Sequence, residues 1–140
     1  MPAPTKQVAH AVLLVNGAYV LQLRDDVPGI AARGKWALFG GSLQDGEAPE
    51  VGLRREILEE LGIMLPECRL FWQVDRHSDF WRQVVRYWFF VSDVTSIWPS
   101  HVVREGRAAG LFRYEELPGD AVAPLIGEVL TRHDAMRRKP

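Results

Sequence analysis

The chain has 140 residues, of which 47% are hydrophobic and 25% charged, the composition of an ordinary soluble globular domain. Its formal net charge of -1 gives no overall positive field that would draw it onto a nucleic-acid polymer or an anionic membrane. No apolar run is long enough to cross a bilayer, and residues 1–7 lack the apolar stretch of a secretory signal. We therefore expect one cytoplasmic domain over residues 1–140, without an intramolecular disulfide because Cys68 is the only cysteine.

The first part of the chain predicts a hairpin followed by a short strand. Apolar and β-branched residues fill three segments bounded by turn residues: 8–15, 18–24 and 36–39. The Asn16-Gly17 pair predicts a tight turn between the first two segments. The polar segment 25–35 is expected to be a loop, and a second loop is expected at Gly40 and Gly41.

Residues 49–61 predict the clearest helix. Pro49 suits the first helical position, which needs no N–H partner, and Gly62 suits the left-handed position just past the end. Gly52 lies inside this helix and costs roughly 0.5–1 kcal/mol relative to alanine. We therefore expect close packing against the sheet at Gly52.

The second half of the chain predicts more strands and a final helix. Three segments are rich in aromatic and β-branched residues: 69–75, 83–93 and 111–114. Phe80 and Trp81 fall between the first two, in an expected loop, and residues 115–117 form a short turn. The last helix has an apolar stripe that includes Leu125 and Val129. This order of elements predicts an α/β fold, with a mixed sheet between helices on both faces.

Three glutamates share one face of the predicted central helix. Glu56 and Glu60 are one helical turn apart, and Glu59 lies three residues after Glu56. Like charges at this spacing repel by roughly 0.2–0.5 kcal/mol per pair in an isolated helix. A hard cation such as Mg²⁺ prefers carboxylate oxygens and would remove the repulsion, so the trio predicts a metal site. The alternative is a solvated acidic face, which is what most acidic runs form.

Two neighbouring features favour the metal site. Gly40 and Gly41 precede the helix, and a backbone without side chains can approach a ligand closely. Glu47 lies near the helix start, where its carboxylate could pair with the Arg55 guanidinium and pin the loop to the helix.

At this point residues 41–63 resemble the signature of the Nudix hydrolases. That signature is a glycine, five residues, a glutamate, seven residues, then Arg-Glu-aliphatic-x-Glu-Glu-x-Gly-aliphatic. Every fixed position is matched, by Gly41, Glu47, Arg55, Glu56, Ile57, Glu59, Glu60, Gly62 and Ile63. Phe39 precedes the two glycines at the position where members of the family often have a proline, a departure that softens the loop but keeps its carbonyls. The resemblance implies an α/β/α sandwich and a pyrophosphohydrolase that cleaves a nucleoside diphosphate linked to another moiety.

The resemblance also implies roles for individual residues. Mg²⁺ or Mn²⁺ would be bound by Glu56, Glu59 and Glu60, joined by the Gly41 carbonyl. Arg55, paired with Glu47, would orient these carboxylates. Gly40 and Gly41 would contact the substrate. Arg24 resembles an arginine that contacts substrate phosphate in related enzymes, although an exposed charge at a strand end is an equally simple explanation.

The general base has two candidates. A bound metal lowers the pKa of the attacking water, and a nearby carboxylate takes its proton. Glu56 is one candidate inside the signature. Glu105, in the stretch that leads to the last strand, is the other, as a base or an extra metal ligand. A loop glutamate of this kind is more often simply exposed to solvent.

Two other functions fit the same resemblance less well. A nucleotide-sensing module with little turnover would be expected to have lost one of Glu56, Glu59 or Glu60, and all three are present. An isoprenoid diphosphate isomerase of related fold would need a catalytic cysteine in the site. Cys68 follows the helix at the start of a predicted strand, where a core position is preferred.

The substrate is less constrained. Asp79 stands where ADP-ribose hydrolases have a proline, and Leu38-Phe39 stands where coenzyme A hydrolases have Phe-Pro. A nucleoside triphosphate, an oxidised nucleotide or a nucleotide sugar is therefore expected as the small-molecule partner. Phe80 and Trp81 are the aromatic residues to consider for stacking on a nucleobase. The other tryptophans are expected in the core or at an interface, which favours a homodimer.

Overall fold

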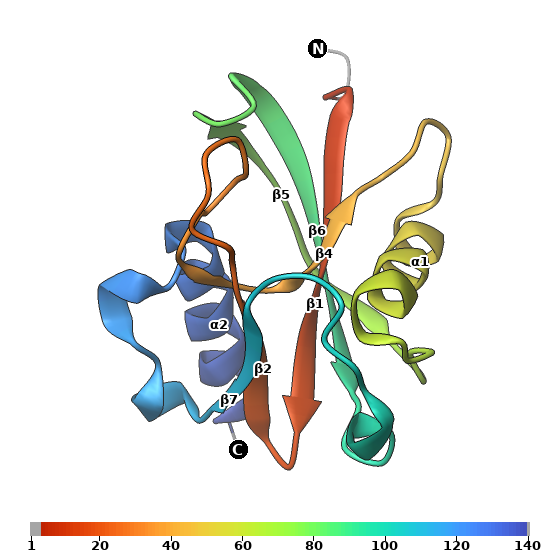
Figure 1. Ribbon diagram of the computed structural model, residues 1–140, viewed down its shortest axis with the longest axis vertical. Coiled ribbons are helices and arrows are strands. Elements are labelled where there is room, and N and C mark those ends of the chain that lie inside the picture. The colour runs from red at the N-terminus through yellow and green to blue at the C-terminus, as the bar shows by residue number, and fades with distance from the viewer. Residues whose placement is uncertain (1–3, 140) are drawn as a thin grey trace.

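The computed structural model describes residues 4–139 of the chain. Residue 140 and residues 1–3, which belong to the segment without a predicted secretory signal, lie outside the described part. Within it, seven strands form one mixed sheet, with α1 (Pro49–Leu61) on one face and α2 (Pro124–Arg137) on the other (Figure 1). The predicted α/β/α sandwich is confirmed. Neither described helix is long and apolar enough to span a membrane.

Strand β1 (Lys6–Val15) lies at the centre of the sheet. On one edge it pairs in parallel with β6 (Gln83–Asp93), which pairs in turn with the antiparallel strand β5 (Arg69–Ser78). On the other edge β1 divides its pairing between two strands. One end of β1 pairs with β4 (Phe39–Ser42), and the other end pairs with β2 (Ala18–Leu23).

Strand β2 carries the sheet away from β1. It pairs with β3 (Trp36–Ala37) and with β7 (Ala108–Phe112), both antiparallel. Three short 3₁₀ helices complete the described elements: η1 (Trp98–Ser100), η2 (Tyr114–Glu116) and η3 (Gly119–Ala121). The β2–β7 pairing matters for function because it brings the segment before Ala108 close to the end of β2.

Each face of the sheet has its own hydrophobic core, because side chains alternate along a strand. The core under α1 includes Ala9, Ala11, Leu13, Leu53, Ile57 and Leu61. The core under α2 includes Val12, Tyr19, Leu21, Phe89, Ile126, Val129 and Leu130. Each fully buried leucine or isoleucine contributes roughly 1.5–3 kcal/mol relative to an exposed one. This burial presses α1 onto the sheet and fixes the direction in which its acidic residues point.

The expected loop at Gly40 and Gly41 was wrong, because both glycines lie in strand β4. Gly40 pairs with His10 and Gly41 with Ala9. A Cβ atom built on Gly40 would lie only 2.1 Å from the Ala9 carbonyl oxygen, so no other residue fits this pairing. The glycines serve a close approach between two strands, which a reading of local turn signals misses.

Several other element limits differ from the prediction. Helix α1 and strand β6 have the predicted bounds, whereas β5 continues to Ser78 through part of the expected loop. Strand β7 begins at Ala108 instead of residue 111, because Ala108 pairs with Leu23 of β2. None of the five tryptophans is fully buried: Trp36, Trp72, Trp88 and Trp98 are partly buried, and Trp81 is 37% exposed.

Candidate active site

The entry into helix α1 is fixed by an ion pair and not by a capping side chain. Ala48 makes no side-chain hydrogen bond to the helix, and Pro49 occupies the first turn. The Arg55 guanidinium binds the Glu47 carboxylate through two hydrogen bonds of 2.9 Å, from Nε to Oε2 and from Nη2 to Oε1. Glu47 Oε1 also accepts the Gln44 amide at 2.9 Å. The loop is thereby tied to the body of the helix.

Arg55 contacts three carboxylates at once. Its hydrogen bonds lower the pKa of Glu47 to about 2, and the same bonds raise the pKa of Arg55. Its Nη1 donates to Glu56 Oε1 at 2.9 Å and lies 3.5 Å from Oε1 of Glu59, whose side chain is 59% exposed. Its Nη2 also donates to the Ser42 carbonyl at 3.2 Å. Arg55 therefore orients two of the predicted metal ligands while Glu47 holds its guanidinium in place.

The Glu56 carboxylate lies against the backbone of β4. A Cβ atom built on Gly41 would lie 2.7 Å from both Cδ and Oε2 of Glu56, so glycine leaves the room that this carboxylate occupies. Burial raises the pKa of Glu56, and the nearby charges of Glu59 and Glu105 act in the same direction, against the effect of Arg55.

Glu60 is buried, with 2% of its surface exposed. Its Oε1 accepts the Gly40 amide at 2.9 Å. Burial, a hydrogen bond with Glu105 and the charges of Glu105 and Glu56 together raise the pKa of Glu60 to about 9. Without a cation, Glu60 therefore keeps a proton at neutral pH, because burial and the neighbouring carboxylates both disfavour the charged form.

Glu105 is exposed, as its loop position predicted, and it still joins the carboxylates of α1. The loop is held to the helix by the Arg104 amide, which donates to the Glu60 carbonyl at 2.8 Å. It is held to β2 by Gln22, whose Nε2 donates to the Glu105 carbonyl at 3.0 Å. At the junction of α1, β4 and this loop, Glu56, Glu60 and Glu105 are thus close enough for their charges to interact.

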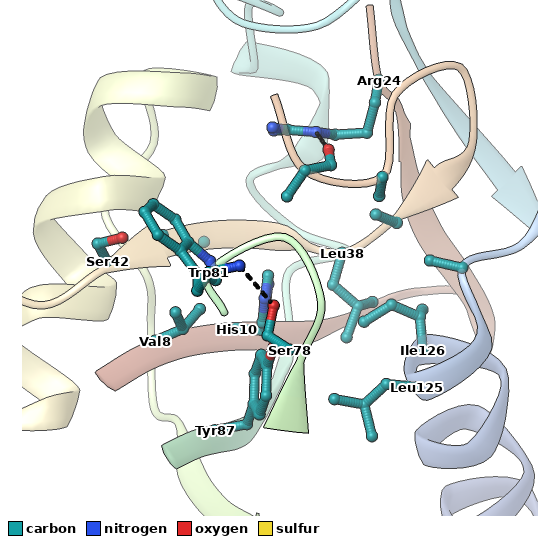
Figure 2. A pocket seen from close by; sticks show the side chains of 16 residues that line it. Val8, His10, Arg24, Leu38, Ser42, Ser78, Trp81, Tyr87, Leu125 and Ile126 are labelled. Atoms are coloured by element: carbon teal, nitrogen blue, oxygen red, sulfur yellow. Dashed lines mark hydrogen bonds between the residues drawn. The ribbon is translucent and has the colours of Figure 1, made fainter. Parts of the chain in front are cut away.

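A pocket of about 220 Å³ lies beside this junction, and we refer to it as the Trp81 pocket. It is lined by Gly40 and Gly41 and by the side chains of His10, Leu38, Trp81, Tyr87, Leu125 and Ile126. Figure 2 shows Arg24 at one end of this pocket and Tyr87 at the other. The Arg24 guanidinium donates from Nε to the Ala31 carbonyl at 3.2 Å and from Nη1 to Gln22 Oε1 at 3.3 Å.

The sequence matches the profile of the NUDIX domain over residues 5–132. The chain belongs to the Nudix family. Among solved structures, it resembles a MutT NUDIX hydrolase from Burkholderia pseudomallei, with a TM-score of 0.77 and 26% identity over 90% of this chain and 95% of that one. A MutT protein from Methanosarcina mazei Go1 shares the fold, with a TM-score of 0.80 and 21% identity over 95% of each chain.

One curated relative is similar in a shorter segment. The nucleoside triphosphatase NudI of Enterobacter sp. (strain 638) is 51% identical over 57 residues, which are 41% of this chain and 40% of NudI. The chain thus spans less than half the length of the curated relative that it matches.

The residues at the junction of α1, β4 and the Glu105 loop fit a divalent cation by their chemistry. Within residues 4–139 no three His, Cys, Asp or Glu side chains already converge as a metal-binding group. Carboxylate oxygens are nevertheless the ligands that Mg²⁺ and Mn²⁺ prefer. Burial raises the pKa of Glu56 and of Glu60, and the neighbouring carboxylates add to the rise, while glycine at position 41 leaves room for the Glu56 carboxylate.

His10 lines the Trp81 pocket, and no role was predicted for it from the sequence. Its ring lies nearly parallel to those of Tyr87 and Phe89, at interplanar angles of 16°. Burial and the nearby charge of Arg24 lower the pKa of His10 to about 4, so the ring is neutral at pH 7. Its Nδ1 is buried and has no hydrogen-bond partner among the described residues. A polar residue in the apolar segment 8–15 was the available signal.

Lys6 is a second residue that the sequence did not indicate. Its Nζ lies 3.6 Å from the centre of the Trp81 ring and donates to Ser42 Oγ at 2.6 Å. Phe80 packs edge-on against Trp81. Lys6 therefore joins the tip of the β5–β6 hairpin to β4 beside the pocket.

Cys68 lies apart from the carboxylates. It is partly buried against the core under α1, and its Sγ accepts a hydrogen bond from Arg54 at 3.6 Å. Burial raises the pKa of the Cys68 thiol, which keeps it protonated. This position suits packing and offers nothing to the isomerase alternative.

Proposed function

We propose that this Nudix protein hydrolyses a phosphoanhydride bond in a nucleoside diphosphate linked to another moiety, with Mg²⁺ or Mn²⁺ as cofactor. The observation that carries the proposal is the proximity of Glu56, Glu60 and Glu105 beside Gly40 and Gly41, where burial and the neighbouring carboxylates raise the pKa of Glu60 to about 9. Such a group of carboxyl groups would suit a divalent cation, which would neutralise charge on a substrate's phosphates. The similarity to a nucleoside triphosphatase favours a nucleoside triphosphate within this class.

The cofactor would be held by the side chains on one face of α1 and by one backbone carbonyl: Glu56, Glu59, Glu60 and Gly41. When bound, it supplies positive charge at the phosphate oxygens and lowers the pKa of a water molecule. Arg55 and Glu47 keep Glu56 and Glu59 directed towards the site. Glu59 remains exposed, so its carboxylate can adjust to a cation at little cost.

The chain's own residues divide the remaining work. Glu105 or Glu56 takes the proton of the attacking water as its oxygen bonds to phosphorus and the bridging P–O bond breaks. Arg24, at the end of the Trp81 pocket, donates hydrogen bonds to a substrate phosphate. The pocket accepts the planar base, with Trp81 as one wall and the neutral His10 as a hydrogen-bond partner.

The test is phosphate and pyrophosphate release from nucleoside triphosphates, oxidised nucleotides, nucleotide sugars and ADP-ribose, with and without Mg²⁺. We expect metal-dependent turnover of one class, which Glu60→Gln lowers by orders of magnitude. Glu67→Gln is the matched control, because Glu67 is exposed and lies outside the site. Glu105→Gln should lower kcat by about 10²–10⁴-fold if Glu105 is the base.

Nucleotide binding without turnover of any member of the panel would contradict hydrolysis and favour the sensing module. Equal turnover by the wild type and Glu60→Gln would contradict the assignment of the carboxylates.

A further inference from the structure

Gln22 is a polar side chain buried in strand β2 among apolar residues. It is 1% exposed and ends a run of four buried residues in β2, after Tyr19, Val20 and Leu21. A buried amide that lacks hydrogen-bond partners destabilises a fold. A leucine or methionine here would avoid that requirement, so the partners of the amide are informative.

Both ends of the Gln22 amide are satisfied by segments of the proposed site. Nε2 donates to the Glu105 carbonyl at 3.0 Å, and Oε1 accepts from Arg24 Nη1 at 3.3 Å. Only one orientation of the amide serves both partners, since a carbonyl must receive the NH₂ group and a guanidinium must meet the oxygen. One buried side chain therefore connects the Arg24 guanidinium to the loop that carries Glu105.

The Glu105 loop is seated directly on Gln22. Gly106 has a φ of +83°, and a Cβ atom there would lie 2.9 Å from both Cγ and Nε2 of Gln22. The Arg107 amide donates to the Leu23 carbonyl at 2.8 Å, immediately after the contact. A change in the position of the Gln22 amide therefore displaces the Glu105 backbone, and with it the carboxylate that meets Glu60.

We propose that Gln22 is a positioning residue that couples Arg24 to Glu105 across strand β2. It holds Glu105 against the α1 carboxylates through one end of its amide and holds Arg24 at the Trp81 pocket through the other end. The inference rests on the proposed function for its kinetic consequences, because Arg24 and Glu105 affect turnover only if a phosphate chain lies between them. The structural link itself requires no substrate.

Two substitutions separate the two ends of the amide. Gln22→Glu keeps an acceptor for Arg24 but has no hydrogen to donate to the Glu105 carbonyl. It should lower kcat by about 2–10-fold, the range of one hydrogen bond, and leave KM nearly unchanged. Gln22→Met loses both ends and should lower kcat and raise KM. If both variants lower kcat by the same factor without a difference in KM, the role is merely structural and the proposal is overturned.

The coupling is measured by a double-mutant cycle between Arg24→Ala and Glu105→Gln, in the wild type and in Gln22→Met. In the wild type, removing Arg24 releases the Gln22 amide and already loosens Glu105. The product of the fold-losses in kcat of the two single variants should therefore exceed the fold-loss of the double variant by at least about 5-fold. In the Gln22→Met background the fold-loss in kcat of the double variant should equal the product of the losses of the two single variants. Equal deviation, or none, in both backgrounds would overturn the coupling.

A measurement on the protein without substrate keeps this test independent of turnover and of how well the Gln22 variants fold. In amide NMR spectra of otherwise wild-type protein, Arg24→Ala should shift the Glu105 and Gly106 signals. Arg33→Ala is the control, because Arg33 pairs with the exposed Asp26 and should leave Gly106 in place. If the Gly106 signal shifts in Arg24→Ala but the wild type turns over no substrate, the proposed function is refuted and the link between Arg24 and the Glu105 loop is supported. An unmoved Gly106 in Arg24→Ala overturns the link, whatever the protein hydrolyses.

Discussion

At the scale of single residues, the guanidinium of Arg55 has a geometric task that charge alone does not perform. It spans the two oxygens of Glu47 with one edge and reaches Glu56 with the remaining nitrogen. Lysine carries the same charge on a single nitrogen and cannot form this fork. The orientation of Glu56 and Glu59 therefore depends on the planar shape of the side chain at position 55.

Arg55→Lys should accordingly lower kcat by about 10–100-fold, the effect typical of losing a residue that orients metal ligands. Steady-state kinetics with Mg²⁺ tests this expectation. Arg54→Lys is the matched control, since Arg54 binds the Leu65 and Pro66 carbonyls and Glu50, away from the site. Similar kcat values for Arg55→Lys and the wild type would refute the orienting role.

His10 gives a prediction about stability and pH. Its pKa is about 4 in the folded protein and near 6.5 in the unfolded chain. Between these values the unfolded chain binds a proton that the folded protein does not, so the free energy of unfolding falls as the pH drops from 6.5 to 4. The loss attributable to His10 is on the order of 3 kcal/mol.

His10→Phe keeps a ring beside Tyr87 and Phe89 and removes the titration. Urea unfolding at pH 7 and pH 4.5 should show a smaller loss of stability for the variant than for the wild type. The carboxylates titrate in both proteins, so the difference between the two slopes isolates His10. Identical slopes would mean that the His10 ring is not held neutral by the fold.

At the scale of elements, the two helices carry glycines with opposite expected responses to alanine. A Cβ atom on Gly52 of α1 would lie 2.4 Å from Leu43 Cδ2 and 2.7 Å from Glu47 Oε1. The packing expected against the sheet is therefore packing against the loop that leads into the helix. Gly127 of α2 has nothing within 4 Å of such an atom.

Gly127→Ala should stabilise the protein by about 0.5–1 kcal/mol, because alanine is the better helix former and meets no neighbour. Gly52→Ala gains the same propensity but forces Leu43 and the Glu47 carboxylate to move, so it should destabilise the protein. It should also lower kcat through the Glu47–Arg55 pair. Urea unfolding measures both variants, and stabilisation by Gly52→Ala would show that the loop yields easily.

The elements also show which features a sequence can predict. The limits of α1 follow from Pro49 and Gly62, and its three glutamates lie on one face by helical periodicity, so local information was sufficient. The bounds of β7 depend on Leu23, and the strand character of Gly40 depends on His10, both far away in sequence. The neighbourhood of Arg24, Gln22 and Glu105 arises from the same β2–β7 pairing. Such contacts leave no periodic pattern in a single sequence.

At the scale of the whole molecule, the site is a joint between parts of the chain that are otherwise separate. Helix α1, strand β4 and the loop containing Glu105 meet at Glu60, which accepts the Gly40 amide through its side chain and the Arg104 amide through its carbonyl. The cost of burying Glu60 beside other carboxyl groups acts against this joint. A bound cation would turn the same charges into attraction and tie the three parts together.

Thermal unfolding in Mg²⁺ and in EDTA should therefore give a higher Tm with the metal. At a free metal concentration of 100 times Kd, the added stability is about 2.7 kcal/mol. Glu60→Gln should be at least as stable as the wild type in EDTA, because glutamine does not have to take up a proton on folding, and should gain much less from Mg²⁺. An equal gain in both proteins would place the stabilising cation elsewhere.

The parallel pairing of β1 with β6 has a consequence for folding during synthesis on the ribosome. Lys6 pairs with Val85 and Leu14 with Asp93, so β1 is synthesised long before its parallel neighbour β6. At about 5–20 residues per second, the interval is roughly 4–16 s. During that time β1 lacks its neighbour β6 and α1 has no completed sheet to pack against. Their apolar side chains are therefore exposed, which favours binding by chaperones. Nascent chains that end before Asp93 should be digested readily by protease, and resistance should appear only in longer ones.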